Sequence, residues 1–525
     1  MGELNFGRIL RRARNYVDHQ AIIDLGSGYE ATYGDHLDRV ARLCGVFSQL
    51  GLGPADRIAV LAGGSHVYVE LWQAALAGGA VLNPLNTRLA PDELVYILED
   101  SSTEVVMVDA AFAPSIAAIR DRLPKLRLVV LIGEPGDADV PHDLALNELM
   151  ASAPARELPD EPADDHPAVL MYTGGTTGLP KGVVLPQRAV ALVIYRMQMG
   201  ARFQPRSRYL AFMPMFHIGG IASWGLLVPT GGTSVVLPAF EPGAVNRAIR
   251  DHQISVIGAV PTMLAMMVQH DEFDPSMLQT LQLVMYGAAP MPPELLDRLI
   301  TMYPDLAFYQ AYGMTECAAT VCGLEAADHR LGGDILRSVG RPCIGVDIEI
   351  RTPDSAQPVP IGEVGEIWIR CDSAMTEYLN KPEQTASSLV DGWYRSGDAG
   401  RLDAAGYLFM ADRVKDMIVS GAENVYSLEV ENAISDHPAV RQVAVVGLPD
   451  ATWGERVHAV VVCDPESVTA EELDSLARSR IAAFKVPKSW TLQSEPLPLS
   501  AAGKVLKRAL RDELSSPTDP VPDDR

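Results

Sequence analysis

Apolar residues recur in short runs along the first half of the chain, and stretches with helical spacing separate these runs. The clearest runs are IAVLAG from Ile58, EVVMVD from Glu104, AVLMYTGG from Ala168 and ISVIGAV from Ile254. A strand covered on both faces has a continuous apolar run, and alternation with helices is typical of parallel sheets in α/β layers. We therefore expect an α/β fold in which layered α/β subdomains form most of a large N-terminal domain.

The pattern changes after about residue 340. The segments VDIEIRT, GEIWIRC and YLFMADR indicate antiparallel strands joined by turns, which predicts a β-rich subdomain. From Arg413 onward, apolar runs and helical patterns, one of them over 470–483, indicate a smaller α+β domain. The expected divisions are 1–412 for the N-terminal domain, 413–514 for the C-terminal domain and 515–525 for a disordered tail.

Composition narrows the class of protein. The balance of 48% apolar and 21% charged residues is that of an ordinary globular protein, and the formal net charge of −24 disfavours binding to nucleic acid or anionic lipid. The six cysteines form no Cys-x-x-Cys pair, and neither a signal peptide nor a membrane-spanning apolar stretch is evident. We expect a cytoplasmic protein with no integral membrane association.

The strongest local signal is TGGTTGLPKG, which runs from Thr173 to Gly182 directly after an apolar strand. Glycines let backbone N–H groups turn toward an anion, threonines add hydroxyl donors, and Lys181 adds positive charge. The segment is not a Walker A loop. A Walker A loop ends in Gly-Lys followed by Ser or Thr, whereas here the lysine precedes a glycine and no Ser or Thr follows in that order. A phosphate-binding loop and a flexible surface turn explain this segment about equally well.

Three later segments carry groups that could serve a nucleotide. YQAYGMTE places a tyrosine close to Glu316, as a stacked purine and a bound magnesium ion would require, although a core tyrosine and a surface carboxylate fit as well. Asp398 and Arg413 could hydrogen-bond to ribose hydroxyls, or they could belong to charged turns. Lys504 follows Ala-Ala-Gly near the end of the chain, where a lysine is usually solvated.

Taken together and in this order, the segments resemble those of the adenylate-forming enzymes, which include acyl-CoA synthetases, beetle luciferases and the adenylation domains of peptide synthetases. The resemblance covers roughly residues 5 to 514 and is closest to the branch of fatty-acyl and aryl-CoA ligases. It implies an active site between a large N-terminal domain and a small, mobile C-terminal domain with a hinge at Lys415.

The resemblance also assigns roles to residues. Thr176, Lys181, His217, Glu316 and Lys504 would be catalytic, and Thr176 and Glu316 would bind Mg²⁺. Gly174 stands where the family usually has serine, so one hydroxyl contact to phosphate is missing. The residues that would contact ATP or AMP are Thr173, Gly174, Gly175, Thr176, Thr177, Gly178, Lys181, Gly287, Ala288, Ala289, Tyr312, Gly313, Thr315, Glu316, Asp398, Arg413 and Lys504.

The two other substrates receive their own residues by the same resemblance. Amino-acid-activating relatives usually have an aspartate in the segment where this chain has Phe-His-Ile-Gly, which indicates an acid without an α-amine. The acyl pocket would be lined by His217, Ile218, Gly219, Ala222, Ser223, Trp224, Gly313 and Met314. Coenzyme A would contact Arg88, Trp453, Phe484 and Lys485, and Ala422 replaces a family glycine at the mouth of the pantetheine channel.

The sequence thus predicts an AMP-forming acyl-CoA synthetase that uses ATP, Mg²⁺ and coenzyme A. The expected substrate is a medium- to long-chain fatty acid, because the predicted pocket segment is small and apolar. An aryl-acid CoA ligase, an acyl-AMP ligase that loads a carrier protein, and a non-catalytic nucleotide-binding protein on the same fold remain alternatives. The expected partners are the acid and CoA, with no nucleic acid, and a homodimer is left open.

Overall fold

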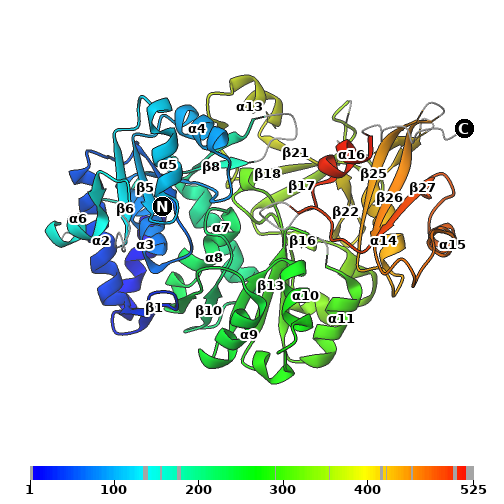
Figure 1. Ribbon diagram of the computed structural model, residues 1–525, viewed down its shortest axis with the longest axis horizontal. Helices are drawn as coiled ribbons and strands as arrows, with labels where there is room; N and C mark the ends of the chain where they lie inside the picture. The colour runs from blue at the N-terminus through cyan, green and yellow to red at the C-terminus, as the bar shows by residue number, and fades with distance from the viewer. Residues whose placement is uncertain are drawn as a thin grey trace, which may run out of the picture.

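A computed structural model describes residues 4–133, 140–153, 157–173, 179–289, 291–353, 355–413, 418–420, 423–450, 453–499 and 505–515. The molecule contains two large sheets, a smaller antiparallel sheet and a C-terminal unit, which lies at one end (Figure 1). The predicted class is confirmed: layered α/β subdomains and a β-rich subdomain precede a smaller C-terminal unit. Of the helices in the described ranges, none has the length and apolar character needed to cross a lipid bilayer.

The first large sheet has the strand order β16-β15-β14-β13-β12-β10-β11-β1-β2. Its pairings are parallel from β1 through β11, β10, β12 and β13 to β14, and its outer strands β2, β15 and β16 are antiparallel. Its strands are β1 (Gln20–Asp24), β2 (Tyr29–Thr32), β10 (Arg208–Ala211), β11 (Thr233–Val236), β12 (Val256–Ala259), β13 (Leu283–Gly287), β14 (Ala307–Tyr312), β15 (Cys322–Leu324) and β16 (Arg341–Pro342).

The second large sheet has the order β19-β9-β8-β4-β3-β5-β6-β7. It is parallel from β8 to β7, whereas β8, β9 and β19 pair antiparallel. Its strands are β3 (Arg57–Leu61), β4 (Val81–Pro84), β5 (Val105–Asp109), β6 (Leu128–Ile132), β7 (Leu144–Ala145), β8 (Pro167–Thr173), β9 (Lys181–Pro186) and β19 (Glu377–Tyr378).

Helices cover both large sheets (Figure 1), and one of the hydrophobic cores contains side chains from both sheets and from some of these helices. Leu82 of β4, Val236 of β11 and Val190 of α7 are all inaccessible to solvent in this core, and Trp72 of α3 stacks on Trp224 of α8 with 4.3 Å between ring centroids. The helices are α1 (Phe6–Arg11), α2 (Tyr33–Gln49), α3 (His66–Ala74), α4 (Pro91–Asp100), α5 (Ala113–Ile119), α6 (Leu146–Ser152), α7 (Gln187–Ala201), α8 (Ile221–Trp224), α9 (Pro242–Asp251), α10 (Pro261–Gln269), α11 (Pro293–Met302), α12 (Ala326–Leu331) and α13 (Pro382–Ser388).

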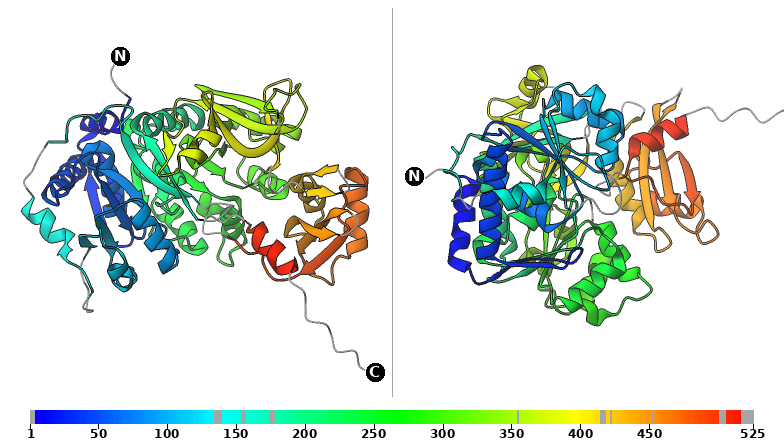
Figure 2. Two further views of the ribbon diagram at one scale, coloured as in Figure 1. Left: turned by 90° about the horizontal axis from the view of Figure 1, so that it is seen from above. Right: turned by 60° about the vertical axis from the view of Figure 1, so that its left-hand side comes forward.

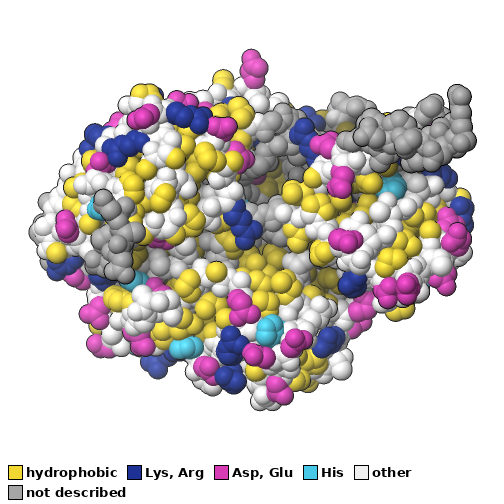
Figure 3. All heavy atoms as spheres, viewed as in Figure 1, with side chains coloured by type: hydrophobic (Ala, Val, Ile, Leu, Met, Phe, Trp, Pro, Cys, Tyr) yellow, Lys and Arg dark blue, Asp and Glu magenta, His cyan; other side chains and the backbone are white. Residues whose placement is uncertain are grey.

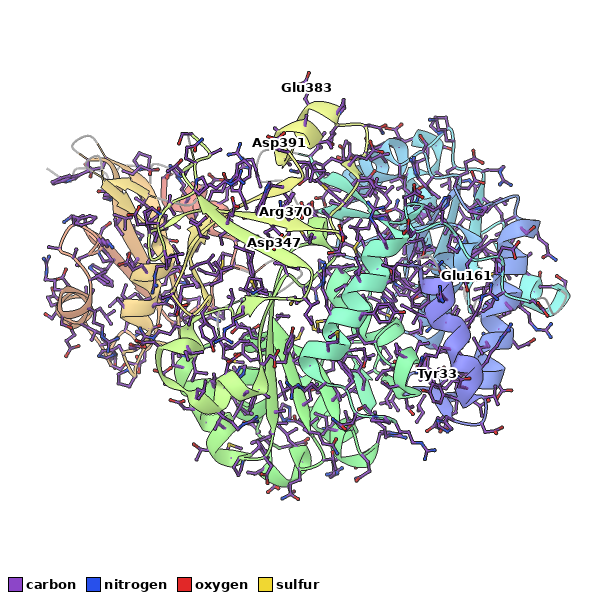
Figure 4. All side chains as sticks on the ribbon, turned by 180° about the vertical axis from the view of Figure 1, so that it is seen from behind. Tyr33, Glu161, Asp347, Arg370, Glu383 and Asp391 are labelled. Atoms are coloured by element: carbon purple, nitrogen blue, oxygen red, sulfur yellow. The ribbon has the colours of Figure 1, made fainter. Side chains whose placement is uncertain are left out.

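The predicted β-rich subdomain is an antiparallel sheet with the order β17-β18-β21-β20, in which β22 also pairs with β21. On the face opposite to Figure 1, Asp347 of β17 and Arg370 of β18 lie directly across from each other and form an ion pair of 2.8 Å (Figure 4). The strands are β17 (Val346–Arg351), β18 (Gly365–Cys371), β20 (Leu389–Val390), β21 (Trp393–Leu402) and β22 (Leu408–Arg413).

The C-terminal unit lies at one end of the molecule in both views of Figure 2. Two clusters of buried residues lie entirely within residues 418–510, so the unit has a core of its own. It contacts the N-terminal part through Arg337, whose guanidinium lies 3.6 Å from the carboxylate of Asp436. Its elements are β23 (Ile418–Ser420), β24 (Glu423–Val425), α14 (Ser427–Ser435), β25 (Gln442–Asp450), β26 (Gly454–Val462), α15 (Ala470–Arg480), β27 (Ser489–Gln493) and α16 (Lys507–Ser515).

Two details of the C-terminal unit differ from the sequence expectation. The helix predicted over 470–483 ends at Arg480, because Ile481 adopts an extended conformation and packs against the core of the unit. Ser515, the first residue of the predicted tail, ends α16, and residues 516–525 lie outside the described part. The boundary at residues 412 and 413 stays a prediction, because residues 414–417, including the predicted hinge Lys415, also lie outside it.

Candidate active site

The glycine- and threonine-rich segment connects two antiparallel strands of the second large sheet. Thr173, the last residue of β8, lies directly across from Lys181, the first residue of β9. Gly174, Gly175, Thr176, Thr177 and Gly178 lie between them and outside the described residues. The two ends of the predicted phosphate loop therefore lie side by side, where the paired strands β8 and β9 meet.

Lys181 and Glu316 lie against the same side chain, that of Tyr378 in β19. The Tyr378 hydroxyl donates a hydrogen bond of 2.9 Å to Oε1 of Glu316, and the Lys181 ammonium lies 4.0 Å from the centroid of the Tyr378 ring. Tyr378 and Glu316 are buried, with exposed fractions of 1% and 9%. Burial and the Glu316 charge raise the pKa of the neighbouring Tyr394 well above its usual value, so that phenol stays protonated. The structure thus brings a cation and a carboxylate from distant segments together.

Sequence reasoning missed Tyr378 and Tyr394. Both are tyrosines in strands, Tyr378 in β19 and Tyr394 in β21, where an aromatic residue is ordinary and carries no motif of its own. Only the pairing of β19 with β9, which sets Tyr378 opposite Val183, reveals that Tyr378 lies beside the predicted phosphate loop.

A second pair lies where β14 meets the β-rich subdomain. The Tyr312 hydroxyl donates to Oδ2 of Asp398 over 2.7 Å, and burial together with the Asp398 charge raises the pKa of Tyr312 well above its usual value. Asp398 on β21 lies directly across from Arg413 on β22, whose side chain is outside the described part. The three residues predicted to hold adenosine are therefore neighbours.

The segments after β13 and β14 lie side by side, because these strands are parallel and Gly287 pairs with Ala311. Gly287 and Ala289 are half-buried and Ala288 is exposed. Carboxyl ends of neighbouring parallel strands are a common place for nucleotides in α/β proteins. After β14, Thr315 and Met314 are half-buried in a turn that presents Glu316, whose carbonyl accepts a hydrogen bond of 2.7 Å from the N–H of Met375.

A close backbone contact explains the glycine at position 313. A Cβ atom built there would lie 1.6 Å from the carbonyl oxygen of Ala319, because the turn after Glu316 folds back onto it. Ala318 and Ala319 have φ values of 56° and 79°, and the Ala319 N–H donates to the Met314 carbonyl over 3.0 Å. Gly313 is thus required by packing, whether or not it also contacts a ligand.

The predicted acyl-pocket segment divides into two parts. His217 and Ile218 are half-buried, Gly219 is exposed, and the rings of Phe216 and His217 lie 4.8 Å apart. The second part, consisting of Ala222, Ser223 and Trp224, is buried in the core. Ser223 and Trp224 line a cavity of about 20 Å³ whose other walls include side chains of α2 and α3. Their assignment to an acyl pocket stays a prediction.

The predicted coenzyme A residues come from two parts of the molecule. Arg88 lies in the loop after β4, where its N–H donates to Oδ1 of Asn86 over 3.0 Å. Trp453 and Phe484 on the C-terminal unit are exposed by 47% and 39%. Lys485 forms an ion pair of 2.6 Å with Glu429 of α14.

Lys504 lies outside the described residues, but the flanks of its segment are defined. Leu499 and Val505 pair across it, and α16 begins at Lys507. Figure 3 shows a hollow between the N-terminal part and the C-terminal unit, with apolar side chains at its border.

Comparison with known proteins agrees with this arrangement. The sequence model of the AMP-binding enzyme family matches residues 9–379, and that of the AMP-binding enzyme C-terminal domain matches residues 429–504. The chain is 36% identical over 508 residues to a feruloyl-CoA synthase of Amycolatopsis sp, covering 96% of this chain and 97% of that one. It is 35% identical over 519 residues to a long-chain-fatty-acid–CoA ligase of Mycobacterium tuberculosis, covering 98% and 99%.

A solved structure shares the whole architecture. ATP-bound MatB from Rhodopseudomonas palustris superposes with a TM-score of 0.87 at 26% identity, covering 97% of this chain and 99% of that one. The match extends over both the N-terminal part and the C-terminal unit. The chain therefore belongs to the AMP-binding enzyme family, in the acyl-CoA synthetase branch of the adenylate-forming enzymes, and is an AMP-forming acid–thiol ligase.

Proposed function

We propose that this enzyme activates a medium- to long-chain fatty acid in two steps. In the first step an oxygen of the fatty-acid carboxylate attacks the α-phosphorus of ATP, and the bond to pyrophosphate breaks. In the second step the thiol of coenzyme A attacks the acyl carbonyl, AMP leaves, and the thiol proton passes to solvent. The products are pyrophosphate, AMP and a fatty-acyl-CoA thioester.

The contact of Lys181 and Glu316 through Tyr378 is the observation that carries the proposal. Attack of a carboxylate on a triphosphate brings two anions together, so positive charge fixed beside the phosphates lowers the barrier. The Lys181 ammonium, at the end of the phosphate loop, supplies such a charge. The Tyr312–Asp398 pair supplies an aromatic ring and a carboxylate that suit adenine stacking and ribose hydroxyls.

The residues near Glu316 fit a magnesium ion. Within the described ranges, no group of three or more His, Cys, Asp or Glu side chains could enclose a metal. Mg²⁺ is commonly bound by one or two carboxylates together with substrate phosphates and water, and the buried Glu316 carboxylate next to the phosphate loop meets that requirement. We propose that Glu316 and Thr176 hold the ion, which would offset the charge of the phosphates when bound.

The C-terminal unit would provide the remaining catalytic group. We propose that Lys504 bridges the carboxylate of the acid and the α-phosphate during adenylation. Rotation about Lys415 would then withdraw Lys504 and bring Trp453, Phe484 and Lys485 toward coenzyme A. The exposure of Trp453 and Phe484 on the C-terminal unit supports a role in contacting a ligand that arrives late.

The side chains near His217 in the sequence support a substrate whose acyl chain carries no charge. The segment AFMPMFHIGGIA from Ala211 contains no acidic or basic side chain apart from the histidine, and Met213, Phe216 and Ile218 are half-buried rather than enclosed in the core. An aryl acid is the second candidate, because similarity to the feruloyl-CoA synthase is as high as that to the long-chain-fatty-acid–CoA ligase. Transfer to a carrier protein instead of coenzyme A is the alternative for the second step.

An ATP–pyrophosphate exchange screen over aliphatic, aromatic and dicarboxylic acids tests the first step. We expect exchange with C8–C18 fatty acids to exceed that with cinnamic and benzoic acids, and the acyl-CoA to form when CoA is added. Preferred exchange with an aryl acid would replace the fatty-acid assignment. Exchange without consumption of CoA would favour a carrier-protein acceptor, and absence of exchange with every acid would refute the proposed reaction.

A further inference from the structure

Tyr378 contacts two predicted functional groups with different parts of one rigid ring. Its hydroxyl donates to Glu316 at the ring edge over 2.9 Å, while the Lys181 ammonium lies on the ring face, 4.0 Å from the centroid. A phenol ring has no internal torsion, so it sets the separation and the relative direction of the two charges. Tyr378 itself lies in none of the segments TGGTTGLPKG and YQAYGMTE that supply these charges.

The backbone around Tyr378 is tied to both segments. The strap formed by residues 375–379 donates three anchoring hydrogen bonds of 2.7–2.9 Å: Met375 N–H to the Glu316 carbonyl, Thr376 N–H to the Val184 carbonyl, and Leu379 N–H to the Gly182 carbonyl. The Tyr378 N–H donates to Oγ1 of Thr385 over 2.9 Å. The strap therefore joins the turn that carries Glu316 to the strand that begins with Lys181.

We propose that Tyr378 is a positioning residue that couples the metal-binding carboxylate to the phosphate-binding lysine, so that a divalent cation and the triphosphate strengthen each other's binding. This inference rests on the proposed function of Lys181 and Glu316. The hydroxyl donates to one of the two carboxylate oxygens of Glu316, Oε1. The ring face lies against the Lys181 ammonium, so one side chain contacts both charged groups.

The contact between Tyr378 and Glu316 is a hydrogen bond in which the phenol hydroxyl is the donor. The Tyr378 hydroxyl donates to Oε1 of Glu316 over 2.9 Å, and both side chains are buried. A hydrogen bond from a neutral hydroxyl to a carboxylate is among the stronger ones in proteins, and loss of a partner by a buried carboxylate is costly. Removal of the hydroxyl alone should therefore release Glu316 to turn toward Lys181.

Binding of one ligand then changes the affinity for the other by a reciprocal factor, which for coupled sites is typically about 5–150-fold. With the hydroxyl present, Mg²⁺ on Glu316 orders the carboxylate, the ring and the lysine together. Without it, the cation and the triphosphate bind to groups that no longer share a fixed geometry. The factor by which Mg²⁺ tightens ATP binding should therefore fall.

The test compares the full-length protein with Tyr378→Phe. The dissociation constant of ATP is measured by calorimetric titration with EDTA and with saturating Mg²⁺, and the ratio of the two constants is the readout. We expect this ratio to be about tenfold smaller in Y378F than in the unaltered protein, which is within the range for coupled sites.

Tyr407→Phe is a closely matched control. The Tyr407 hydroxyl donates to Oδ1 of Asp328 over 2.7 Å, and the Arg341 guanidinium lies 4.2 Å from the Tyr407 ring centroid. Tyr407 therefore makes the same two kinds of contact as Tyr378, outside the predicted site. Its loss should leave the ratio unchanged.

A variant that fails to fold is recognised by its melting curve, and in that case Tyr378→Met, which keeps the bulk of the side chain, takes its place. An unchanged ratio in a folded Tyr378 variant, alongside a reduced ratio in Glu316→Gln, would overturn the coupling role of Tyr378 while leaving the proposed function intact. If ATP does not bind to the unaltered protein, or if Glu316→Gln leaves the ratio unchanged, then the proposed roles of Lys181 and Glu316 are refuted. The coupling role of Tyr378, which rests on them, is refuted with them.

Discussion

Replacing Gly313 with alanine should lower both the stability of the N-terminal part and the rate of adenylation. A Cβ at this position would lie 1.6 Å from the Ala319 carbonyl oxygen, 2.6 Å from the Ala319 carbonyl carbon and 3.0 Å from Cα of Thr320. All three are backbone atoms, so no side chain can rotate away. Carbon and carbonyl oxygen normally approach to about 3.3 Å, so the turn must move by about 1.7 Å.

The expected cost follows from this displacement. Overpacking usually costs about 1–3 kcal/mol, and a backbone clash of this depth belongs at the upper end, near about 3 kcal/mol. For a cooperative unit of roughly 400 residues, with an unfolding entropy of about 2.1 cal/mol/K per residue, that corresponds to a fall in melting temperature of about 3–4 °C. The same turn carries Glu316, and a displacement of about 1 Å in a positioned group can cost about 100-fold in rate.

Scanning calorimetry and ATP–pyrophosphate exchange measure the two effects of Gly313→Ala. Gly219→Ala is the control for stability, because a Cβ built at Gly219 meets no atom within 4 Å and its backbone is not in the left-handed region. We expect G219A to melt within about 1 °C of the unaltered protein, as exposed substitutions usually do. If G313A and G219A melt at the same temperature, the packing explanation for Gly313 is refuted.

Three further changes are predicted. Glu316→Gln should lower the rate of pyrophosphate exchange by about 10²–10³-fold without lowering the melting temperature, since the amide oxygen can still accept the Tyr378 hydrogen bond. A loss of exchange accompanied by a lower melting temperature would contradict this. Tyr312→Phe leaves the ring but removes the donor to Asp398, a charge-assisted bond worth about 1.5–3 kcal/mol, so the dissociation constant of ATP should rise by roughly tenfold or more; an unchanged constant in a binding titration would count against the adenosine site. Burial raises the pKa of Asp109 to about 6, so the folded state binds this proton more tightly than the unfolded state does. The free energy of unfolding should therefore decrease as pH rises from about 4 to about 6, and Asp109→Asn should remove that slope and raise the melting temperature at pH 7.5, as melting curves across this pH range would show.

Local patterns along the chain were sufficient for the fold class, and they singled out segments of the candidate site. Continuous apolar runs predicted the buried parallel strands, because a strand covered on both faces leaves no position for a polar side chain. The change to alternating strands after about residue 340 predicted the β-rich subdomain. Glycine, threonine and lysine after an apolar strand marked the loop between β8 and β9, since its chemistry is carried by neighbouring residues.

Contacts between distant segments were decided only by the tertiary structure. Tyr378 lies beside Lys181 because β19 pairs with β9, and no local period encodes a pairing between segments so far apart. The packing of Trp224 against Trp72 could not be read from its apolar segment, because a hydrophobic side chain has the same local pattern whether it faces a ligand or the core. Gly313 resembled a ligand-contacting glycine, and the close approach of Ala319 that requires it exists only once the turn after Glu316 has folded back.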